Sequence, residues 1–317
     1  MTETNTPPRK GSFLGAPLWL DMAALPVGFA DFAFLGIPYG VPYDMDGVVP
    51  RAAAAPEAVR GACDWFTGEL HHYDFDLEGP LFPEGREWKI ADCGDVPGDP
   101  RDLEGNARRA TEAVRAILDG GAVPLVVGGD HAIPPLVVAA YEGHGPLNVI
   151  DIDAHLDFRE EVAGVQGGYS STMRRLRDIP WVRDIREIGL RGPGSARPED
   201  VEAARAAGNV LIRADEVHER GVEHVIERLE RDARYYITVD VDGLDPSAAP
   251  GTPWPLPGGL TYSQTARLLR GVAVRGQIVG MDVCEYAPSL DVNRLTALTI
   301  VRLLMNVMGV NARRRQY

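Results

Sequence analysis

The stretch that decides the fold is the apolar segment Leu147-Asn-Val-Ile150 with the charged run Asp151-Ile-Asp153-Ala-His155-Leu-Asp157 that follows it directly. The apolar segment predicts a short buried strand, and the run lies at its carboxyl end. Because side chains alternate between the two faces of a strand, the four charged side chains are predicted to share one face. Three carboxylates and an imidazole desolvate poorly together unless a cation lies among them. The run therefore predicts a divalent metal site; the alternative is a set of caps and surface charges at a strand end.

Two further predicted strands end in residues that can bind metal. Val123-Pro-Leu-Val-Val127 precedes Gly128-Gly-Asp-His131, where the glycines allow a sharp turn that presents His131 at the strand tip. Alone, this histidine would be interpreted as a core or capping residue. The segment from Tyr235 ends in Asp240-Val-Asp242, and the same alternation places its two carboxylates on one face. Since sites in open α/β sheets form at the carboxyl ends of strands, the three strand ends are expected to meet.

The chemistry of these side chains narrows the choice of metal. No cysteine lies near the motifs, whereas structural zinc favours cysteine and an all-oxygen shell favours Mg²⁺ or Ca²⁺. A mixed imidazole and carboxylate set suits manganese, with Ni, Co, Fe or Zn also compatible. Six protein ligands exceed the need of one catalytic ion, so two ions about 3.5 Å apart fit the count better. The predicted ligands are His131, Asp153, His155, Asp157, Asp240 and Asp242.

The rest of the chain predicts an α/β fold. Apolar strand segments alternate with helical stretches, which favours a parallel sheet with helices on both faces. All 317 residues are expected to form a single domain, because α/β domains reach this length. Residues 1–10 are expected to be disordered, and 11–31 to form an N-terminal arm that packs on a neighbouring subunit or covers the site. Helices are predicted over 56–66, 106–118, 222–232, 261–274 and 295–310, and strands over 185–191 and 210–213.

Composition restricts the partners and the compartment. The net charge of −14 argues against a nucleic-acid surface, and Arg313-Arg-Arg315 is expected to be a solvated tail. No apolar run reaches the roughly 18 residues that a membrane span needs, and the N-terminus lacks the apolar core of a signal peptide. The three cysteines are widely spaced, which favours a reducing cytosol over a disulfide framework. These features predict a cytoplasmic protein that binds neither nucleic acid nor membrane.

The motifs together resemble those of the ureohydrolase family, which contains the arginases and agmatinases. The resemblance rests on GGDH at 128–131, DIDAHLD at 151–157 and TVDVDGLDP at 238–246. It also includes the strand-like segment Gly280-Met-Asp-Val-Cys-Glu285 and the loop Ala249 to Leu260, and it runs from about Phe34 to the last predicted helix. It implies a three-layer arginase-like fold and an agmatinase-like amidinohydrolase that assembles as a trimer or hexamer.

The resemblance also assigns roles to residues. It implies two Mn²⁺ per subunit, one held by His131, Asp153, Asp157 and Asp240, the other by Asp153, His155, Asp240 and Asp242. A hydroxide bridging the metals would attack the carbon of a small cationic guanidino substrate, giving urea and an amine. Glu285 would bind the guanidinium through paired hydrogen bonds, with a surface or ion-paired carboxylate as the alternative. Asp151 and Asp282 are expected to accept hydrogen bonds behind the ligands or from neighbouring groups, and Asp245 to orient its loop or the metal shell.

Two positions depart from the family pattern. Many members carry a proton-shuttling histidine after the second motif, whereas Tyr169 or a neighbouring serine takes that place here. Tyr169 either donates a proton to the leaving amine or only lines the pocket, because an ordinary pKa near 10 makes it a poor acceptor. Trp254 makes the loop after the second Asp pair stiffer and more apolar, and it is expected to form a substrate-binding wall or a packed surface loop.

Two alternative functions remain open at this point. The first is hydrolysis of a guanidino acid or a formimino compound on the same metal centre, which an arginine in the pocket would indicate. Arg159, Arg174 and Arg191 are the arginines considered for that role, with structural or surface ion pairs as the alternative for each. The second is a non-catalytic relative that binds metal, which the missing histidine favours and the retained ligands and Glu285 disfavour.

Overall fold

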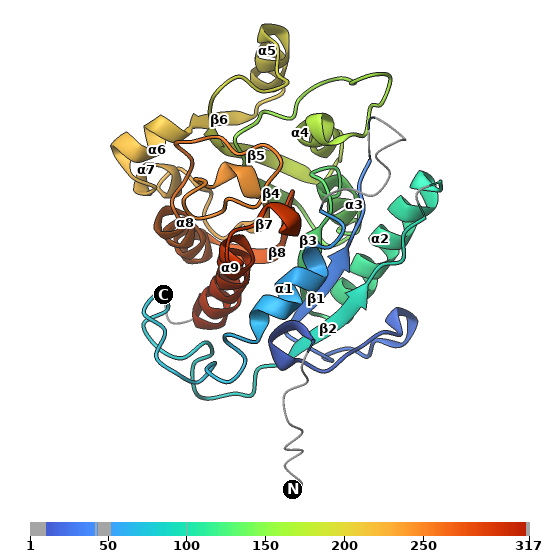
Figure 1. Cartoon of the computed structure of the whole chain (residues 1–317), viewed down its shortest axis with the longest axis vertical. Coiled ribbons are helices and arrows are strands. Elements are labelled where there is room, and N and C mark those ends of the chain that lie inside the picture. The colour runs from blue at the N-terminus through green and yellow to red at the C-terminus, as the bar shows by residue number, and fades with distance from the viewer. Residues whose placement is uncertain (1–10, 42, 44–51, 100, 315–317) are drawn as a thin grey trace, which may run out of the picture.

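A single eight-stranded parallel sheet forms the centre of the computed structural model, which describes residues 11–41, 43, 52–99 and 101–314. The predicted disorder of residues 1–10 lies outside the described part of the chain. The strand order is β2-β1-β3-β8-β7-β4-β5-β6 (Figure 1). The strands are β1 (Phe32–Ile37), β2 (Ile90–Asp95), β3 (Val123–Gly128), β4 (Leu147–Ile152), β5 (Val182–Leu190), β6 (Val210–Arg213), β7 (Arg234–Asp240) and β8 (Gln277–Cys284).

Helices cover both faces of the sheet and give three layers. Alternate residues of each strand supply the two cores: Phe32 and Phe34 of β1 pack on one face, and Ala33 and Leu35 on the other. The first face carries α1 (Ala55–Cys63), α6 (Ala214–Arg220), α7 (Glu223–Ile226), α8 (Tyr262–Arg275) and α9 (Leu295–Arg313). The second carries α2 (Leu103–Asp119), α3 (Pro134–Ala139), α4 (Thr172–Arg177) and α5 (Pro198–Ala206). The predicted three-layer α/β fold is confirmed.

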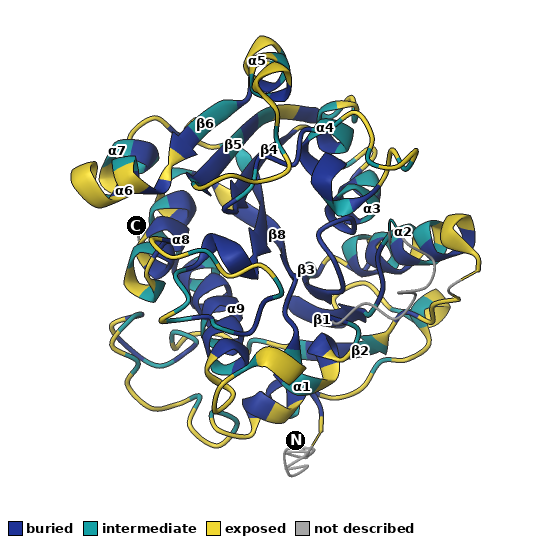
Figure 2. Ribbon diagram, turned by 45° about the horizontal axis from the view of Figure 1, so that its top comes forward, coloured by how far each residue is buried: buried dark blue, intermediate teal, exposed yellow. Residues whose placement is uncertain are grey.

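The sequence analysis expected no segment long and apolar enough to span a membrane, and helix α9 departs from this expectation. Within the described residues it is the one helix long and apolar enough to cross a membrane by length and composition. However, 72% of its apolar window is buried inside the protein. It packs beside α1 and α8 against the sheet, where Figure 2 shows it largely buried. Its apolar composition therefore serves the core of this fold.

Several predicted boundaries are corrected by capping and turn geometry. Helix α2 begins at Leu103, three residues before its predicted start, because the Asp102 side chain accepts a hydrogen bond from the Gly105 amide. Helix α7 ends at Ile226 rather than at residue 232, and Asp232 takes a positive φ of 57° before β7. Strand β2 and the short helices α3 to α6 were not predicted, because segments of six to nine residues are too short to give a clear periodic signal.

The N-terminal arm packs along β2, the outer strand of the sheet. Phe13 stacks on Phe34 with ring centroids 4.5 Å apart, and its amide donates to Asp92 Oδ2 at 2.8 Å. Trp19 donates to the Asp92 carbonyl, and the Asp92 amide donates to the Pro17 carbonyl. The arm therefore covers an exposed sheet edge, where unpaired backbone groups would otherwise be available to other chains.

The C-terminal basic run was expected to be a solvated tail, but its first residue, Arg313, is not solvated. Arg313 is buried at the end of α9. Its guanidinium donates to the carbonyls of Leu81 and Gly309 at 2.9 and 3.0 Å, and also to the Pro80 carbonyl. These bonds tie the last helix to the segment that precedes β2. Arg315, the last residue of the run, lies outside the described residues.

The ion pair between Arg60 and Asp92 is predicted to hold the arm, α1 and β2 together. Asp92 is fully buried, and Arg60 Nε donates to it at 2.8 Å. Replacing Arg60 with Met leaves a buried carboxylate without its cation, so we expect a loss of about 3 kcal/mol in the free energy of unfolding. Urea denaturation measures this loss. Arg213→Met, which breaks an exposed pair with Asp215, is the control and should change little. Equal effects of the two variants would contradict the role of the buried pair.

Candidate metal centre

The predicted ligands meet at the carboxyl ends of β3, β7 and β4, and β8, which is followed by Glu285, lies between β3 and β7 in the sheet. Their imidazole nitrogens and carboxylate oxygens form two groups whose members lie within 4.8 Å of one another, and Asp153 belongs to both. Asp157 lies beside them, with Oδ2 3.1 Å from His131 Nδ1. Asp240, which was expected to be shared, belongs to one group only. The groups are His131, Asp153 and Asp240, and Asp153, His155 and Asp242.

Turns, rather than strand alternation, bring these side chains together. β4 ends at Ile152 and β7 at Asp240, so the alternation predicted for the two motifs does not extend through them. Asp157 takes a φ of 44°, and Asp242 lies in the 3-10 turn Val241–Gly243 with its amide donating to Asp240 Oδ1 at 2.9 Å. A Cβ at Gly243 would lie 2.5 Å from the Ile152 carbonyl oxygen. Glycine at this position therefore allows the turn after β7 to pack on the end of β4.

The chain bends at Gly129 before His131, and the glycines there permit close packing. Gly128 and Gly129 are not among the described glycines with positive φ. A Cβ at Gly129 would lie 2.2 Å from the carbonyl oxygen of Tyr39, which is backbone and cannot move aside cheaply. The absence of a side chain at residue 129 thus lets the segment after β1 approach β3 and sets the position from which His131 enters the site.

A buried chain of hydrogen bonds fixes the orientation of the His131 ring. Nδ1 faces the carboxylates of Asp153 and Asp157, both at 3.1 Å, whereas Nε2 lies 3.0 Å from Thr238 Oγ1. The Thr238 hydroxyl donates to Asp282 Oδ1 at 2.7 Å, and Tyr236 donates to the other oxygen. Because Thr238 donates its hydroxyl hydrogen to Asp282, the Thr238 oxygen can only accept a hydrogen from Nε2 of His131. Nδ1 is then left with the lone pair that a metal ion requires.

Thr238 and Tyr236 were missed by the sequence analysis, although the signal was present. They precede Asp240 at intervals of two in β7, so the alternation that holds inside a strand places all three on one face. Asp282 was expected to accept hydrogen bonds either behind the ligands or from neighbouring groups. It accepts from Thr238, behind the predicted ligand His131, so the first alternative is confirmed. Asp245 accepts from the amides of Ser247 and Gly258 and thereby orients its loop, as expected.

Asp151 lies behind the site with no hydrogen bond of its own. Both of its carboxylate oxygens are buried without a hydrogen-bond partner among the described residues, and Oδ1 is 3.7 Å from His131 Nε2. Its register partner on β5, Glu187, is also fully buried and receives one hydrogen bond, from Asn209 at 2.7 Å. Burial raises the pKa of both carboxyls well above the ordinary range. Burial therefore disfavours the charged form of both Asp151 and Glu187.

Burial and mutual repulsion raise the pKa of most carboxyls in the cluster. Burial and the charge of Asp153 raise the pKa of Asp157 to about 7. Burial and the neighbouring charges of Asp242 and Asp153 hold the pKa of Asp240 well above its ordinary range. Burial would lower the pKa of His131, but hydrogen bonds to Asp153 and Asp157 raise it well above its usual value. Such a cluster binds protons tightly unless divalent cations replace them, so the donor set fits a metal centre.

Glu285 lines a pocket of about 360 Å³ together with Asp157, Asp240 and Asp242 of the cluster. The alternative of a surface carboxylate is wrong, because Glu285 is only 7% exposed. Its amide donates to the Gly129 carbonyl at 2.9 Å, and its Oε1 accepts from the His131 amide at 2.9 Å. Its backbone takes a φ of 59°, a region that non-glycine residues rarely adopt and that costs about 1–3 kcal/mol. Burial and the charge of Asp130 raise its pKa to about 8.

Aromatic side chains also line this pocket. Tyr169 packs on Tyr43 with ring centroids 4.6 Å apart, and the Tyr43 hydroxyl accepts from the Ser170 amide at 2.8 Å. Burial and the neighbouring Tyr43 raise the pKa of Tyr169 to about 12, so its hydroxyl stays protonated at neutral pH. Trp254 lies at the rim with 57% of its surface exposed. No residue of the arm 11–31 is among the residues that line this pocket.

Of the three arginines considered for a carboxylate-bearing substrate, only Arg159 lines this pocket. Arg174 pairs with Glu160 and lies over the Phe158 ring, and Arg191 donates to backbone carbonyls that include Leu256 at 2.7 Å. Arg174 and Arg191 therefore have structural roles, which was the alternative expected for them.

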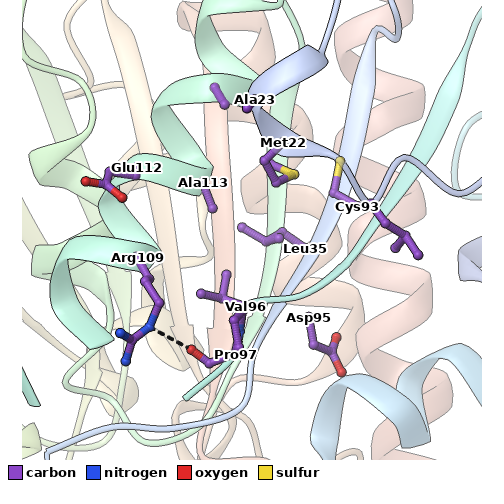
Figure 3. A pocket seen from close by; sticks show the side chains of 12 residues that line it. Met22, Ala23, Leu35, Cys93, Asp95, Val96, Pro97, Arg109, Glu112 and Ala113 are labelled. Carbon is purple, nitrogen blue, oxygen red and sulfur yellow. Dashed lines mark hydrogen bonds between the residues drawn. The ribbon is translucent and has the colours of Figure 1, made fainter. Parts of the chain in front are cut away.

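A second cavity, of about 530 Å³, lies between the arm, β2 and α2. Figure 3 shows its largely apolar wall, with Met22, Leu35 and Val96 among the labelled side chains. The Arg109 guanidinium at its edge is already bound, with Nε donating to the Pro97 carbonyl at 3.0 Å. None of the metal-binding groups lines this cavity, so the acidic cluster belongs to the smaller pocket.

Comparisons with known proteins match this chain over nearly its whole length. Residues 31–309 match the sequence model of the Arginase family. The chain is 32% identical over 306 residues to the guanidinopropionase of Pseudomonas aeruginosa, which covers 94% of this chain and 90% of that protein. It is 31% identical over 318 residues to the mitochondrial agmatinase of Gallus gallus, covering 96% and 89%. The solved structure of proclavaminate amidino hydrolase from Streptomyces clavuligerus superposes with a TM-score of 0.79 at 28% identity, covering 98% of this chain and 100% of that one.

The pKa shifts predict how stability without metal depends on pH. Asp157, Asp240, His131 and His155 all have raised pKa values, so above pH 4 the folded cluster binds more protons than the unfolded chain. The free energy of unfolding of chelator-treated protein should therefore fall as pH rises from about 4 to 8. Added Mn²⁺ should raise the melting temperature more at pH 8 than at pH 5, because it replaces the lost protons.

Differential scanning calorimetry of chelator-treated protein tests this dependence. Asp240→Asn removes one of the repelling charges, so without metal it should melt above the unmodified chain at pH 8. A melting temperature that is unchanged or higher at pH 8 than at pH 5 would contradict the charge-cluster interpretation.

The hydrogen-bond chain predicts that Thr238 controls metal affinity. Thr238→Val keeps the shape of the side chain and removes the acceptor for His131 Nε2, so the ring loses the partner that fixes its tautomer. We expect the affinity for Mn²⁺ to fall about 10- to 100-fold, as measured by isothermal titration calorimetry. Thr238→Ser keeps the hydroxyl and serves as the control. Equal affinities of the Val and Ser variants would show that the hydroxyl does not act on the ligand.

Proposed function

The chain belongs to the arginase family, and from this premise we propose that it cleaves a small guanidino compound to urea and an amine at a centre of two manganese ions. The observation that carries the proposal is the position of Asp153 in two adjacent buried groups of imidazoles and carboxylates, with Glu285 lining the same pocket. The two groups contain no arginine or lysine among the described residues, so a pair of divalent cations would supply the positive charge that the buried carboxylates need.

The proposed ligands are those expected from the sequence. His131, Asp153, Asp157 and Asp240 would hold one ion, and Asp153, His155, Asp240 and Asp242 the other. When bound, the two ions would lower the pKa of a water molecule and so supply the nucleophile for the guanidinium carbon. The mixed set of nitrogen and oxygen donors favours manganese, with Ni, Co, Fe or Zn as competitors.

Glu285 is proposed to bind and orient the substrate. A carboxylate and a planar guanidinium form two parallel charge-assisted hydrogen bonds. The His131 amide holds Oε1 at 2.9 Å, which orients the carboxylate. The positive φ of residue 285 turns the chain immediately after β8, and this strain is consistent with a role in binding.

Tyr169 and Trp254 are proposed to complete the pocket. The Tyr169 hydroxyl remains protonated and is available to donate a hydrogen to the amine as it leaves, which is the part of the missing histidine's role that a phenol can fulfil. Trp254 would form an apolar wall against the substrate's methylene groups. A purely non-catalytic relative would not need Glu285 in a strained and buried position beside the ligands.

We also propose that the chain acts as a single domain in a cytoplasmic trimer or hexamer. The three cysteines, Cys63, Cys93 and Cys284, are buried and free, which agrees with a reducing compartment. The family of the chain supports the assembly, and size-exclusion chromatography with light scattering measures it.

Urea release by Mn-loaded protein tests the proposed reaction. Asp153→Ala removes the residue that the two groups share, so both ions should be lost and activity should fall about a thousandfold or more. Asp119→Ala, an exposed aspartate near His144, is the matched control and should keep full activity. Circular dichroism confirms that each variant folds. Undiminished urea release by folded Asp153→Ala protein would exclude the proposed centre.

A further inference from the structure

Among the described residues that line the pocket, one carries a guanidinium group. Arg159 follows the second motif and is the only lysine or arginine among the described residues that line the pocket. The acidic lining residues are Asp157, Asp240, Asp242 and Glu285, all of them proposed metal ligands or the guanidinium partner. No other described carboxylate lines the pocket to pair with an ammonium group at the far end of a substrate.

The Arg159 guanidinium is held in place by the protein. Its Nη1 donates to the Ser195 carbonyl at 2.9 Å, and its Nε lies 3.3 Å from Asp200 Oδ2. Asp200 is itself fixed, because the same oxygen accepts from the Arg197 amide at 2.9 Å at the start of α5. The Arg159 side chain is 15% exposed, so its entropy is largely lost before any ligand binds.

This arrangement leaves part of the guanidinium unused. Within the described residues Nη2 of Arg159 has no hydrogen-bond acceptor, whereas Nη1 and Nε each have a partner. Ser195 and Gly194 line the pocket beside it. A carboxylate is the ligand that a preorganised guanidinium recognises best, through short charge-assisted hydrogen bonds.

We infer that the substrate is an ω-guanidino carboxylate, with its guanidinium at Glu285 and its carboxylate at Arg159. The inference rests on the proposed function, since it names the substrate class for the same metal centre. An amine-bearing substrate such as agmatine would place its ammonium near Arg159 and meet repulsion without a compensating acid. The volume of about 360 Å³ suits a small acid with a short methylene chain, which Trp254 and Tyr43 would contact.

The test compares initial rates of urea release from guanidinoacetate, 3-guanidinopropionate, 4-guanidinobutyrate and agmatine by Mn-loaded protein. At least one of the acids should exceed agmatine about tenfold or more in kcat/KM. Arg159→Met should lower kcat/KM for that acid about 10- to 100-fold, mainly through KM, because it removes a charged hydrogen bond remote from the reacting carbon. The rate with agmatine should stay unchanged or rise.

Further variants separate recognition from folding. Arg174→Met is the matched control, because Arg174 pairs with Glu160 outside the pocket, and its substrate preference should equal that of the unmodified chain. Arg159→Lys keeps the charge and should restore part of the affinity for the acid. Adding Asp200→Asn to Arg159→Met removes the carboxylate that the single variant would leave unpaired, and the double variant should show the same loss of preference.

The outcomes distinguish this inference from the function on which it rests. Preference for agmatine by the unmodified chain, or an equal effect of Arg159→Met on agmatine and the acids, would overturn the role of Arg159 and leave the hydrolase intact. No urea from any of the four compounds, with two Mn²⁺ per subunit measured by elemental analysis, would overturn the proposed function and this inference together.

Discussion

The parallel pairing of β3, β8, β7 and β4 holds four distant chain segments with their carboxyl ends at one place in the sheet. Apolar residues on both faces bury these strands between two layers of helices, so the segments that follow them have little freedom to separate. Every predicted metal ligand and Glu285 lies in one of those segments or at the end of a strand. The hydrophobic burial of the sheet therefore supports an electrostatically unfavourable cluster that would not assemble by itself.

Within this frame, each side chain of the site is oriented by a contact that is not itself part of the reaction. The hydroxyl of Thr238 and the carboxylate of Asp282 orient His131 from behind, and the His131 amide in turn orients Glu285. Gly243 allows the turn that carries Asp242 to pack on the end of β4. These supporting contacts explain why the ligands converge although they come from separate turns, and they make the precision of the site depend on buried neighbours.

The lining of the pocket carries groups of opposite charge. Asp157, Asp240, Asp242 and Glu285 are carboxylates that divalent cations and a guanidinium would neutralise, whereas Arg159 is a cation in the same lining. A molecule with a cationic and an anionic end matches such a pocket better than a dication does. Arg159 follows one of the motifs and lines the pocket without being a predicted metal ligand, so a change at this position can alter substrate preference while the ligands stay intact.

The sequence by itself determined the α/β class and identified side chains that the structure brings together in one buried cluster, because apolar strand cores followed by Asp and His are a local pattern. The sequence did not predict how these side chains are brought together. The alternation of side chains stops where β4 ends at Ile152 and β7 ends at Asp240. Asp157 and Asp242 reach the cluster through turns that depend on packing against other strands. Likewise, Arg159, Arg174 and Arg191 were equivalent in the sequence. Only the tertiary structure separated them, because whether an arginine faces a pocket or its own backbone carbonyls is set by contacts with segments tens of residues away.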